Sequence, residues 1–176
     1  ASVDLAGEKG AFPALDATRY LQSGFARRLP DDIRRAVAER GIRNSHLLSI
    51  APTGTIALAF ADNASNGIEP AFAWSYTRRK RMPDGSTRED AVEDHAYRLF
   101  RERGGDTMCL PEAFVSALDM TAEQHLQMLV AVQPFIDSSI SKTVNVPAEY
   151  PFESFRGLYM QAWKAGLKGL ATYRPN

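Results

Sequence analysis

The residues of this sequence best suited to chemistry form a short polar turn between two largely apolar segments. The run at residues 46–50 leads through Ala-Pro into Thr53-Gly54-Thr55, and a second apolar segment begins at Ile56. This pattern predicts a strand, a turn and the start of a helix, whose free first-turn N–H groups favour an anion. Gly54 would let the backbone approach a phosphate, and both threonine hydroxyls could donate to it. Because no Gly-Lys-Ser/Thr follows, the turn is not a Walker A loop.

The same residues also fit a simpler interpretation. A threonine between a strand and a helix is a common N-cap, and spacing alone favours that cap over an anion site. A second loop at residues 63–70, Asn-Ala-Ser-Asn-Gly-Ile-Glu-Pro, changes the balance. It can be an Asx-rich turn that ends in X-Pro. Functionally, it could brace the first loop through Asn63, Asn66 and its single carboxylate, Glu69.

The elements that must position these loops alternate between helices and short strands. Apolar spacing, capping residues and breakers predict helices at 16–22, 30–40, 89–103, 121–133 and 151–165. Strands are expected at 46–50, 142–146 and 170–173, with a hairpin formed by 74–81 and 87–89. We therefore expect one helix-rich α/β domain over residues 1–176, with too few strands to close a sheet alone.

Composition narrows the class of protein. The chain has 176 residues, 44% of them hydrophobic and 24% charged, with a formal net charge of +0. It shows no global basic excess for nucleic acid, no apolar run of about 18 residues for a membrane span, and no signal-peptide pattern. We therefore expect a cytoplasmic protein without nucleic-acid or membrane partners. The opening without methionine and the ending just after a strand suggest a piece of a longer protein.

Other reactive residues fit ordinary structural roles better. The basic run at residues 77–81 could dock phosphates, but alternation on a hairpin favours a solvated strand or a surface facing a missing part. The three histidines are too widely spaced for a metal site, so none is expected. Cys109 is the only cysteine, which excludes an internal disulfide and a Cys-rich zinc site. The serines at 138, 139 and 141 lack a hydrolase elbow.

Taken in order along the chain, these motifs resemble ribonucleotide reductase large subunits, especially the adenosylcobalamin-dependent class II enzymes. Residues 51–56 and 63–70 are similar to the family's substrate-diphosphate loop and the segment after it. Residues 137–147 resemble a late barrel strand, and residues 162–176 resemble the closing helix and strand. The resemblance runs from about Leu5 onward. It implies the C-terminal part of a ten-stranded α/β barrel.

The resemblance also implies roles for the loop residues. Backbone N–H groups of the first loop would hold a nucleoside diphosphate, with a second loop in support. The implied phosphate-binding residues are Thr53, Gly54, Thr55 and Ile56, and the implied supporting residues are Asn63, Asn66 and Glu69.

One departure from the family pattern points to the subclass. Class I subunits carry adjacent tyrosines shortly after the Gly-Leu-Lys element, where they pass a radical from a second subunit. Here Ala171 and Thr172 stand at those positions, and Tyr173 follows alone. The resemblance therefore implies a radical that is made locally from adenosylcobalamin, which in the whole enzyme would bind mostly outside this chain.

The catalytic cysteines, asparagine and glutamate of the family lie upstream of the phosphate loop, outside this chain, and Cys109 matches none of them. We therefore expect a substrate-diphosphate-binding segment of a class II reductase, inactive alone, which needs the N-terminal catalytic part as its partner. The alternative is a non-catalytic relic or interaction module that kept the fold without substrate binding.

Overall fold

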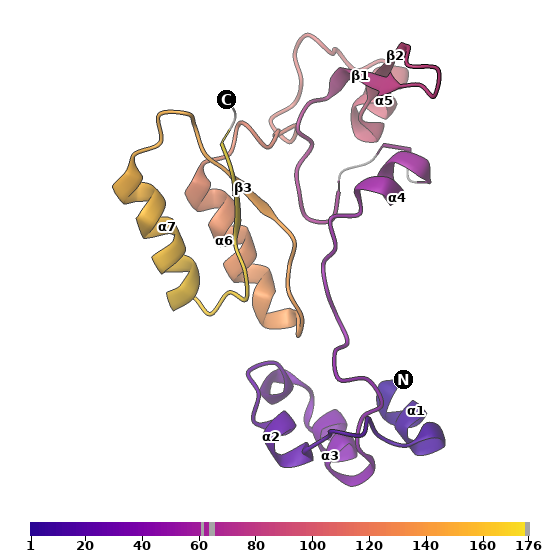
Figure 1. Cartoon of the computed structure of the whole chain (residues 1–176), viewed down its shortest axis with the longest axis vertical. Helices are drawn as coiled ribbons and strands as arrows, with labels where there is room; N and C mark the ends of the chain where they lie inside the picture. Colours follow the sequence, from indigo (N-terminus) through magenta and orange to yellow (C-terminus); the bar gives the residue numbers. More distant parts are fainter. Residues whose placement is uncertain (61, 64–65, 175–176) are drawn as a thin grey trace.

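The computed structural model of the chain describes residues 1–60, 62–63 and 66–174. Figure 1 shows a group of N-terminal helices at one end and two neighbouring groups at the other, joined by an extended segment that follows α3. Two separate clusters of buried apolar side chains correspond to the N-terminal helices and to the C-terminal helices and strands.

The N-terminal helices are α1 (Ser2–Lys9), α2 (Ala17–Leu21), the 3-10 turn η1 (Ala26–Arg28) and α3 (Asp31–Arg40). They pack around Val3, Val37 and Ile42. The predictions at 16–22 and 30–40 are confirmed as α2 and α3. Helix α1 was not predicted, because its buried face consists only of Val3 and Ala6 and its apolar periodicity is weak.

The C-terminal group contains α6 (Ala122–Val132), η2 (Gln133–Phe135), β3 (Thr143–Asn145), α7 (Phe152–Lys164) and β4 (Ala171–Tyr173). Strands β3 and β4 pair in parallel in the register Thr143↔Ala171 to Asn145↔Tyr173, with α7 as the crossover between them. The predicted capping box of Thr121 and Gln124 is present at the start of α6. Leu129 and Leu158 pack from the two helices against this sheet.

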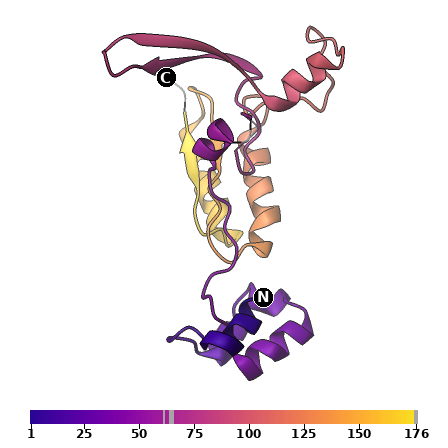
Figure 2. The same ribbon diagram turned by 90° about the vertical axis from the view of Figure 1, so that its right-hand side faces the viewer.

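Between these groups lie α4 (Gly54–Ala59), the hairpin of β1 (Ser75–Arg81) and β2 (Thr87–Glu93), and α5 (His95–Glu102). Figure 2 shows the antiparallel hairpin as a long arm that extends from the rest of the chain. The prediction of a helix at 89–103 is wrong for residues 89–93, because β2 continues to Glu93. Asp94 then accepts from the amides of Ala96 and Tyr97 and so fixes the helix start at His95.

The strand expected at 46–50 does not form as a regular strand. Only Ile50 makes a parallel bridge, with Ile140. The carboxylate of Asp137 accepts hydrogen bonds from the amides of Leu47 (2.6 Å) and Leu48 (2.7 Å), so a side chain takes the donors that a neighbouring strand would use.

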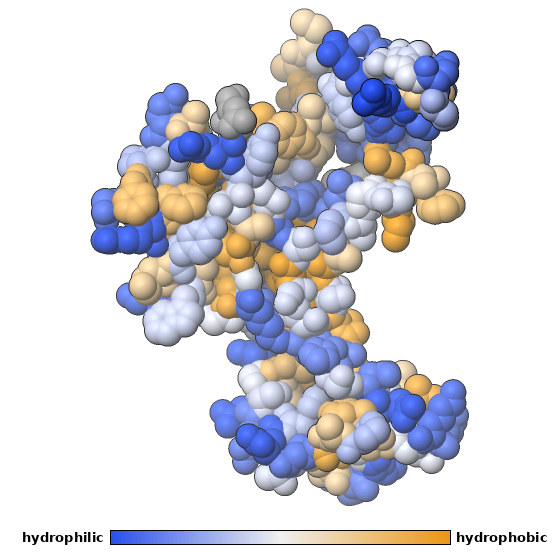
Figure 3. All heavy atoms as spheres, viewed as in Figure 1, coloured by the Kyte–Doolittle hydropathy of each residue, from blue (hydrophilic) through white to orange (hydrophobic). Residues whose placement is uncertain are grey.

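The described residues contain two separate two-stranded sheets and no closed barrel, in agreement with the expected helix-rich α/β fold with an incomplete sheet. Leu58 and Phe60 are more than half exposed, and Figure 3 shows hydrophobic surface at the place of α4, close to the hydrophilic hairpin. No helix in the described part of the chain is long and apolar enough to span a bilayer.

Candidate functional site

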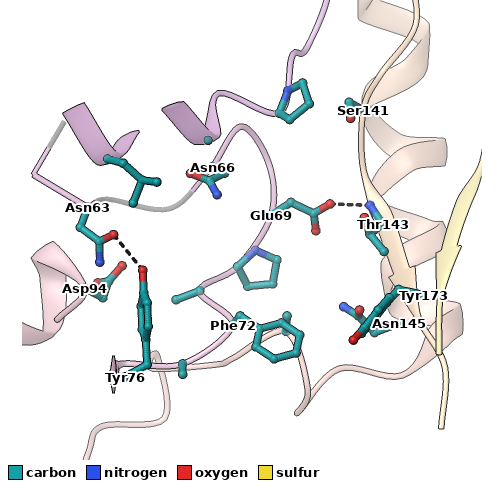
Figure 4. Close-up of a pocket in the computed structure, with 17 residues that line it drawn as sticks. Asn63, Asn66, Glu69, Phe72, Tyr76, Asp94, Ser141, Thr143, Asn145 and Tyr173 are labelled. Atoms are coloured by element: carbon teal, nitrogen blue, oxygen red, sulfur yellow. Dashed lines mark hydrogen bonds between the residues drawn. The ribbon is translucent and has the colours of Figure 1, made fainter. Parts of the chain in front are cut away.

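A cavity of about 710 Å³ lies between the loop around α4 and the strands β3 and β4. Figure 4 shows the two sides facing each other, with Asn63, Asn66 and Tyr76 on one side and Thr143, Asn145 and Tyr173 on the other. Its volume is within the range of sites for small molecules. The lining residues are Pro52, Gly54, Leu58, Asn63, Asn66, Glu69, Pro70, Ala71, Phe72, Ala73, Tyr76, Asp94, Ala117, Ser141, Thr143, Asn145 and Tyr173.

The Thr53-Gly54 turn reaches this cavity through its glycine. Gly54 begins α4 and lines the cavity, and a Cβ added there would meet nothing within 4 Å. Thr55 and Ile56 are exposed and are not among the lining residues. The first turn of α4 leaves the amides of these three residues without acceptors within the helix. The cavity wall at Gly54 is therefore bare backbone beside amides that have no acceptor within the helix.

Thr53 stands at the N-cap position without acting as a cap. Its backbone is left-handed (φ 53°, ψ 17°), a strained conformation for a β-branched residue, and its side chain makes no capping hydrogen bond. Instead, its Oγ1 accepts a hydrogen bond of 2.8 Å from the amide of Gly67, in the second loop. The two loops recognised in the sequence are thus joined by a direct hydrogen bond.

Asn63, Asn66 and Glu69 of the second loop all line the cavity. Asn63 is left-handed (φ 60°), which suits asparagine, and it links three elements. Its amide donates to the carbonyl of Ala57 (2.9 Å), its Nδ2 donates to the carbonyl of Glu93 (2.9 Å), and its Oδ1 accepts from the hydroxyl of Tyr76 (3.2 Å). Asn63 therefore fixes the hairpin to α4 at the edge of the cavity.

Glu69 connects the second loop to β3. Its Oε2 accepts from the ammonium of Lys142 at 2.9 Å, and its Oε1 accepts a short hydrogen bond from the amide of Thr143. The side chain of Lys142 is fully buried. Its ammonium also lies 2.7 Å from Nδ1 of His125 and donates to the carbonyl of Thr143 at 3.2 Å.

His125, which sequence reasoning treated as an ordinary helix residue, is completely buried in this network. Because the Lys142 ammonium can only donate, Nδ1 of His125 must accept, and Nε2–H then donates to the carbonyl of Ala117 at 3.0 Å. Burial, and then the charge of Lys142, hold the pKa of His125 below its ordinary value of 6.5. The folded protein thus keeps His125 neutral.

The strand residues of the cavity were not identified from the sequence. Ser141, Thr143 and Asn145 line the cavity, whereas Val144 and Val146 are buried against the helices. The alternation at 141–146 could have predicted that the residues at 141, 143 and 145 share one face, since successive side chains of a strand point to opposite faces. Tyr173 lines the cavity from β4, the strand that also contains Ala171 and Thr172.

The remaining candidates lie away from the cavity or already have partners. Cys109 is an exposed free thiol and is not a lining residue. In the basic hairpin, Arg79 pairs with Glu89 and Arg88 with Asp90. Across the described ranges, no group of three or more His, Cys, Asp or Glu residues could hold a metal ion.

Comparison with known proteins gives the family. The model of the ribonucleotide reductase barrel domain matches residues 1–173. The chain belongs to the ribonucleotide reductase family. The cavity is therefore formed by loop and strand residues of a segment of the reductase barrel.

Individual relatives agree with this assignment. The chain is 34% identical to a vitamin B12-dependent ribonucleoside-diphosphate reductase of Mycobacterium tuberculosis, over 99% of this chain and 25% of that protein. It is 32% identical to a vitamin B12-dependent ribonucleotide reductase of Streptomyces coelicolor, over 82% of this chain and 17% of that protein. The chain thus spans a quarter or less of the length of these two reductases.

A solved structure supports the fold. The class Id ribonucleotide reductase alpha subunit of Actinobacillus ureae superposes with a TM-score of 0.63, at 18% identity, over 99% of this chain and 31% of that one. The expected barrel fold is therefore confirmed. The residues matched by the barrel-domain model include the open parallel β3–β4 sheet.

The buried histidine predicts how the stability of this reductase segment depends on pH. The unfolded chain binds a proton at His125 as the pH falls below about 6.5, whereas the folded chain resists it. The unfolding free energy should be fully retained above pH 6.5. It should fall by up to about 1.4 kcal/mol per pH unit below that value.

Chemical denaturation between pH 5 and 8 would measure this dependence, with pH steps of about half a unit on either side of the ordinary histidine pKa. His125→Asn should flatten the curve. His46→Gln, which removes an exposed histidine, is the matched control and should keep the wild-type curve. A wild-type slope in His125→Asn would contradict the assignment of the effect to this residue.

Proposed function

We propose that this chain supplies the substrate-diphosphate-binding segment of a vitamin B12-dependent, class II ribonucleotide reductase, and that residues 1–176 act as one part of its barrel. The observation that carries the proposal is the hydrogen bond between Thr53 and Gly67, which joins the two loops at one cavity where Gly54 is open. The names of the mycobacterial and streptomycete relatives support the B12-dependent class. Ala171 and Thr172, in place of a tyrosine pair, support it as well.

The phosphate would be held by backbone donors. Among the described residues that line the cavity, none is Lys, Arg or His. The amides of Gly54, Thr55 and Ile56, together with the positive end of the helix, supply the attraction that side chains do not. The Thr55 hydroxyl adds a donor, and the Thr53 hydroxyl can donate its proton while its oxygen accepts from Gly67.

The two carboxylates of the cavity do not oppose an anion freely. Glu69 is neutralised by Lys142, and the Asp94 carboxylate accepts from the amides that begin α5. The lining is thus largely apolar, with one carboxylate paired with a cation and one held by backbone amides. Such a site would bind phosphate weakly by itself, so ribose and base contacts from the rest of the enzyme are needed for affinity.

The chemical step belongs to the rest of the enzyme. Within this chain the only thiol, Cys109, is outside the cavity lining, so we assign no catalytic residue here. Adenosylcobalamin would supply the radical for the whole enzyme. We propose that this cofactor binds mostly outside this chain. The partner would be the N-terminal catalytic part of the reductase, in the cytoplasm.

Binding of phosphate compounds tests the proposal. Titration of the chain with pyrophosphate, a nucleoside diphosphate and a nucleoside triphosphate, followed by phosphorus NMR, should give weak saturable binding. Thr55→Val removes one hydrogen bond to the anion, and Gly54→Ala places a methyl group where the phosphate would approach the backbone, so each should weaken binding about tenfold. Gly54→Ala is expected to fold normally, because the position is helical and open.

Gly157→Ala and Thr77→Val are the matched controls. Gly157 is also a helical glycine with nothing near an added Cβ, and Thr77 is an exposed threonine on β1. Both variants should bind as the wild type does. If the loop variants bind as tightly as these controls, the phosphate site is not at α4, and the interaction-module alternative gains.

The proposal also predicts the ribonucleotide reductase activity of the chain, alone and in a mixture. The chain alone should not reduce ribonucleotides, even with adenosylcobalamin and a dithiol, because it lacks the catalytic cysteines. Mixing with the N-terminal part of a class II reductase should produce turnover, measured as deoxyribonucleotide by chromatography. Turnover by the chain alone would refute the division of roles, and no gain on mixing would favour a non-catalytic relic.

A further inference from the structure

The side chain of Lys142 is fully buried, although it directly precedes β3, whose residues Thr143 and Asn145 line the cavity. A buried ammonium is tolerated only when it is paired and hydrogen-bonded. Lys142 is not a lining residue, and its ammonium contacts His125 on α6, while its neighbours Ser141 and Thr143 line the cavity. Its three contacts are Glu69, His125 and the carbonyl of Thr143, which matches the three donors of an ammonium group.

These contacts connect elements that are far apart in sequence. His125 lies on α6 and is fixed in one tautomer by the carbonyl of Ala117. Glu69 lies 73 residues before Lys142 and also accepts from the amide of Thr143. The core of the helical layer is thus joined to the second loop through one cation.

From Glu69 the connection continues to the phosphate turn. The amide of Glu69 donates to the carbonyl of Asn66 at 2.8 Å, which forms a tight turn around Gly67. Gly67 is left-handed (φ 56°), and an added Cβ would lie 2.7 Å from the carbonyl oxygen of Ala51. The amide of Gly67 then donates to Oγ1 of Thr53. A displacement of Glu69 would therefore shift the residue that holds Thr53.

We propose that Lys142 and His125 are positioning residues of the reductase: they hold Glu69 against β3, and through Gly67 they fix the Thr53-Gly54 turn in the geometry that receives the substrate phosphate. The proposal rests on the phosphate site proposed above. Neither residue touches the phosphate. Lys142 also neutralises Glu69, whose carboxylate would otherwise face an anion in the cavity.

Amide hydrogen exchange of the whole chain, measured by NMR without ligand, tests the connection directly. Lys142→Met should raise the exchange rates of the Gly67 and Thr143 amides about tenfold relative to the wild type, because their acceptors become mobile. Amides in the middle of α7 should keep their rates. Lys168→Met is the matched control, because Lys168 donates to the carbonyl of Asp137 away from this network.

Glu69→Gln gives a second readout, because glutamine keeps the size of this side chain, which is about a quarter exposed (23%), while it removes the charge that pairs with Lys142. It should raise the same two exchange rates, by about threefold to fivefold, since one hydrogen bond weakens without a cavity. Wild-type exchange at Gly67 and Thr143 in folded Lys142→Met or Glu69→Gln would overturn the proposal.

A double-mutant cycle separates positioning from general stability. Lys142→Met should weaken pyrophosphate binding by about tenfold, but by much less when Thr53→Val has already removed the link to Gly67. If the effects of Lys142→Met and Thr53→Val are fully additive, Lys142 does not act through Thr53. If Lys142→Met/Glu69→Gln recovers the wild-type affinity, Lys142 acts only by neutralising Glu69. Either result would overturn the proposal. If the wild type binds no pyrophosphate, the phosphate site fails, while the exchange experiment still decides the connection.

Discussion

The need to neutralise one buried cation organises the centre of this structure. Moving the ammonium of Lys142 out of water is costly, and only close partners can offset that cost. The partners come from a loop and a helix, Glu69 and His125, so satisfying Lys142 brings β3, α6 and residues 66–70 together. The cavity is formed where these elements meet. The contacts of the buried Lys142 thereby determine where the residues that line the cavity lie.

The alternation of side chains along β3 and the residues on either side of it separates these two roles. Residues 141, 143 and 145 are polar and line the cavity, whereas residues 142, 144 and 146 are buried against the helical layer. Because successive side chains of a strand point to opposite faces, one short segment serves both the core and the site. A parallel strand of a barrel can be extended on each side, which fits a chain whose β3–β4 sheet remains open.

The cavity has a chemical character that suits a part of an enzyme. Its lining combines bare backbone at Gly54 with two carboxylates, one paired with Lys142 and one hydrogen-bonded to backbone amides, and in the described part of the chain no basic side chain contributes to it. Backbone donors can orient a phosphate with little charge, but they give modest affinity alone. This agrees with a chain that covers a quarter or less of the length of its mycobacterial and streptomycete relatives. The proposed division of labour follows: this chain orients the substrate, and the remainder performs the reaction.

The sequence by itself determined the local elements and the family. Capping residues, glycine stops and apolar spacing predicted α2, α3, α6, α7 and the hairpin, and ordered motifs pointed to the reductase barrel. It did not predict that Asp137 would accept from the amides at 47–48 or that Thr53 would accept from the amide of Gly67. Least of all did it reveal that Lys142, His125 and Glu69 meet. Periodicity and caps act over a few neighbouring residues, whereas these contacts join side chains to groups up to 90 positions apart, so only tertiary packing could decide them.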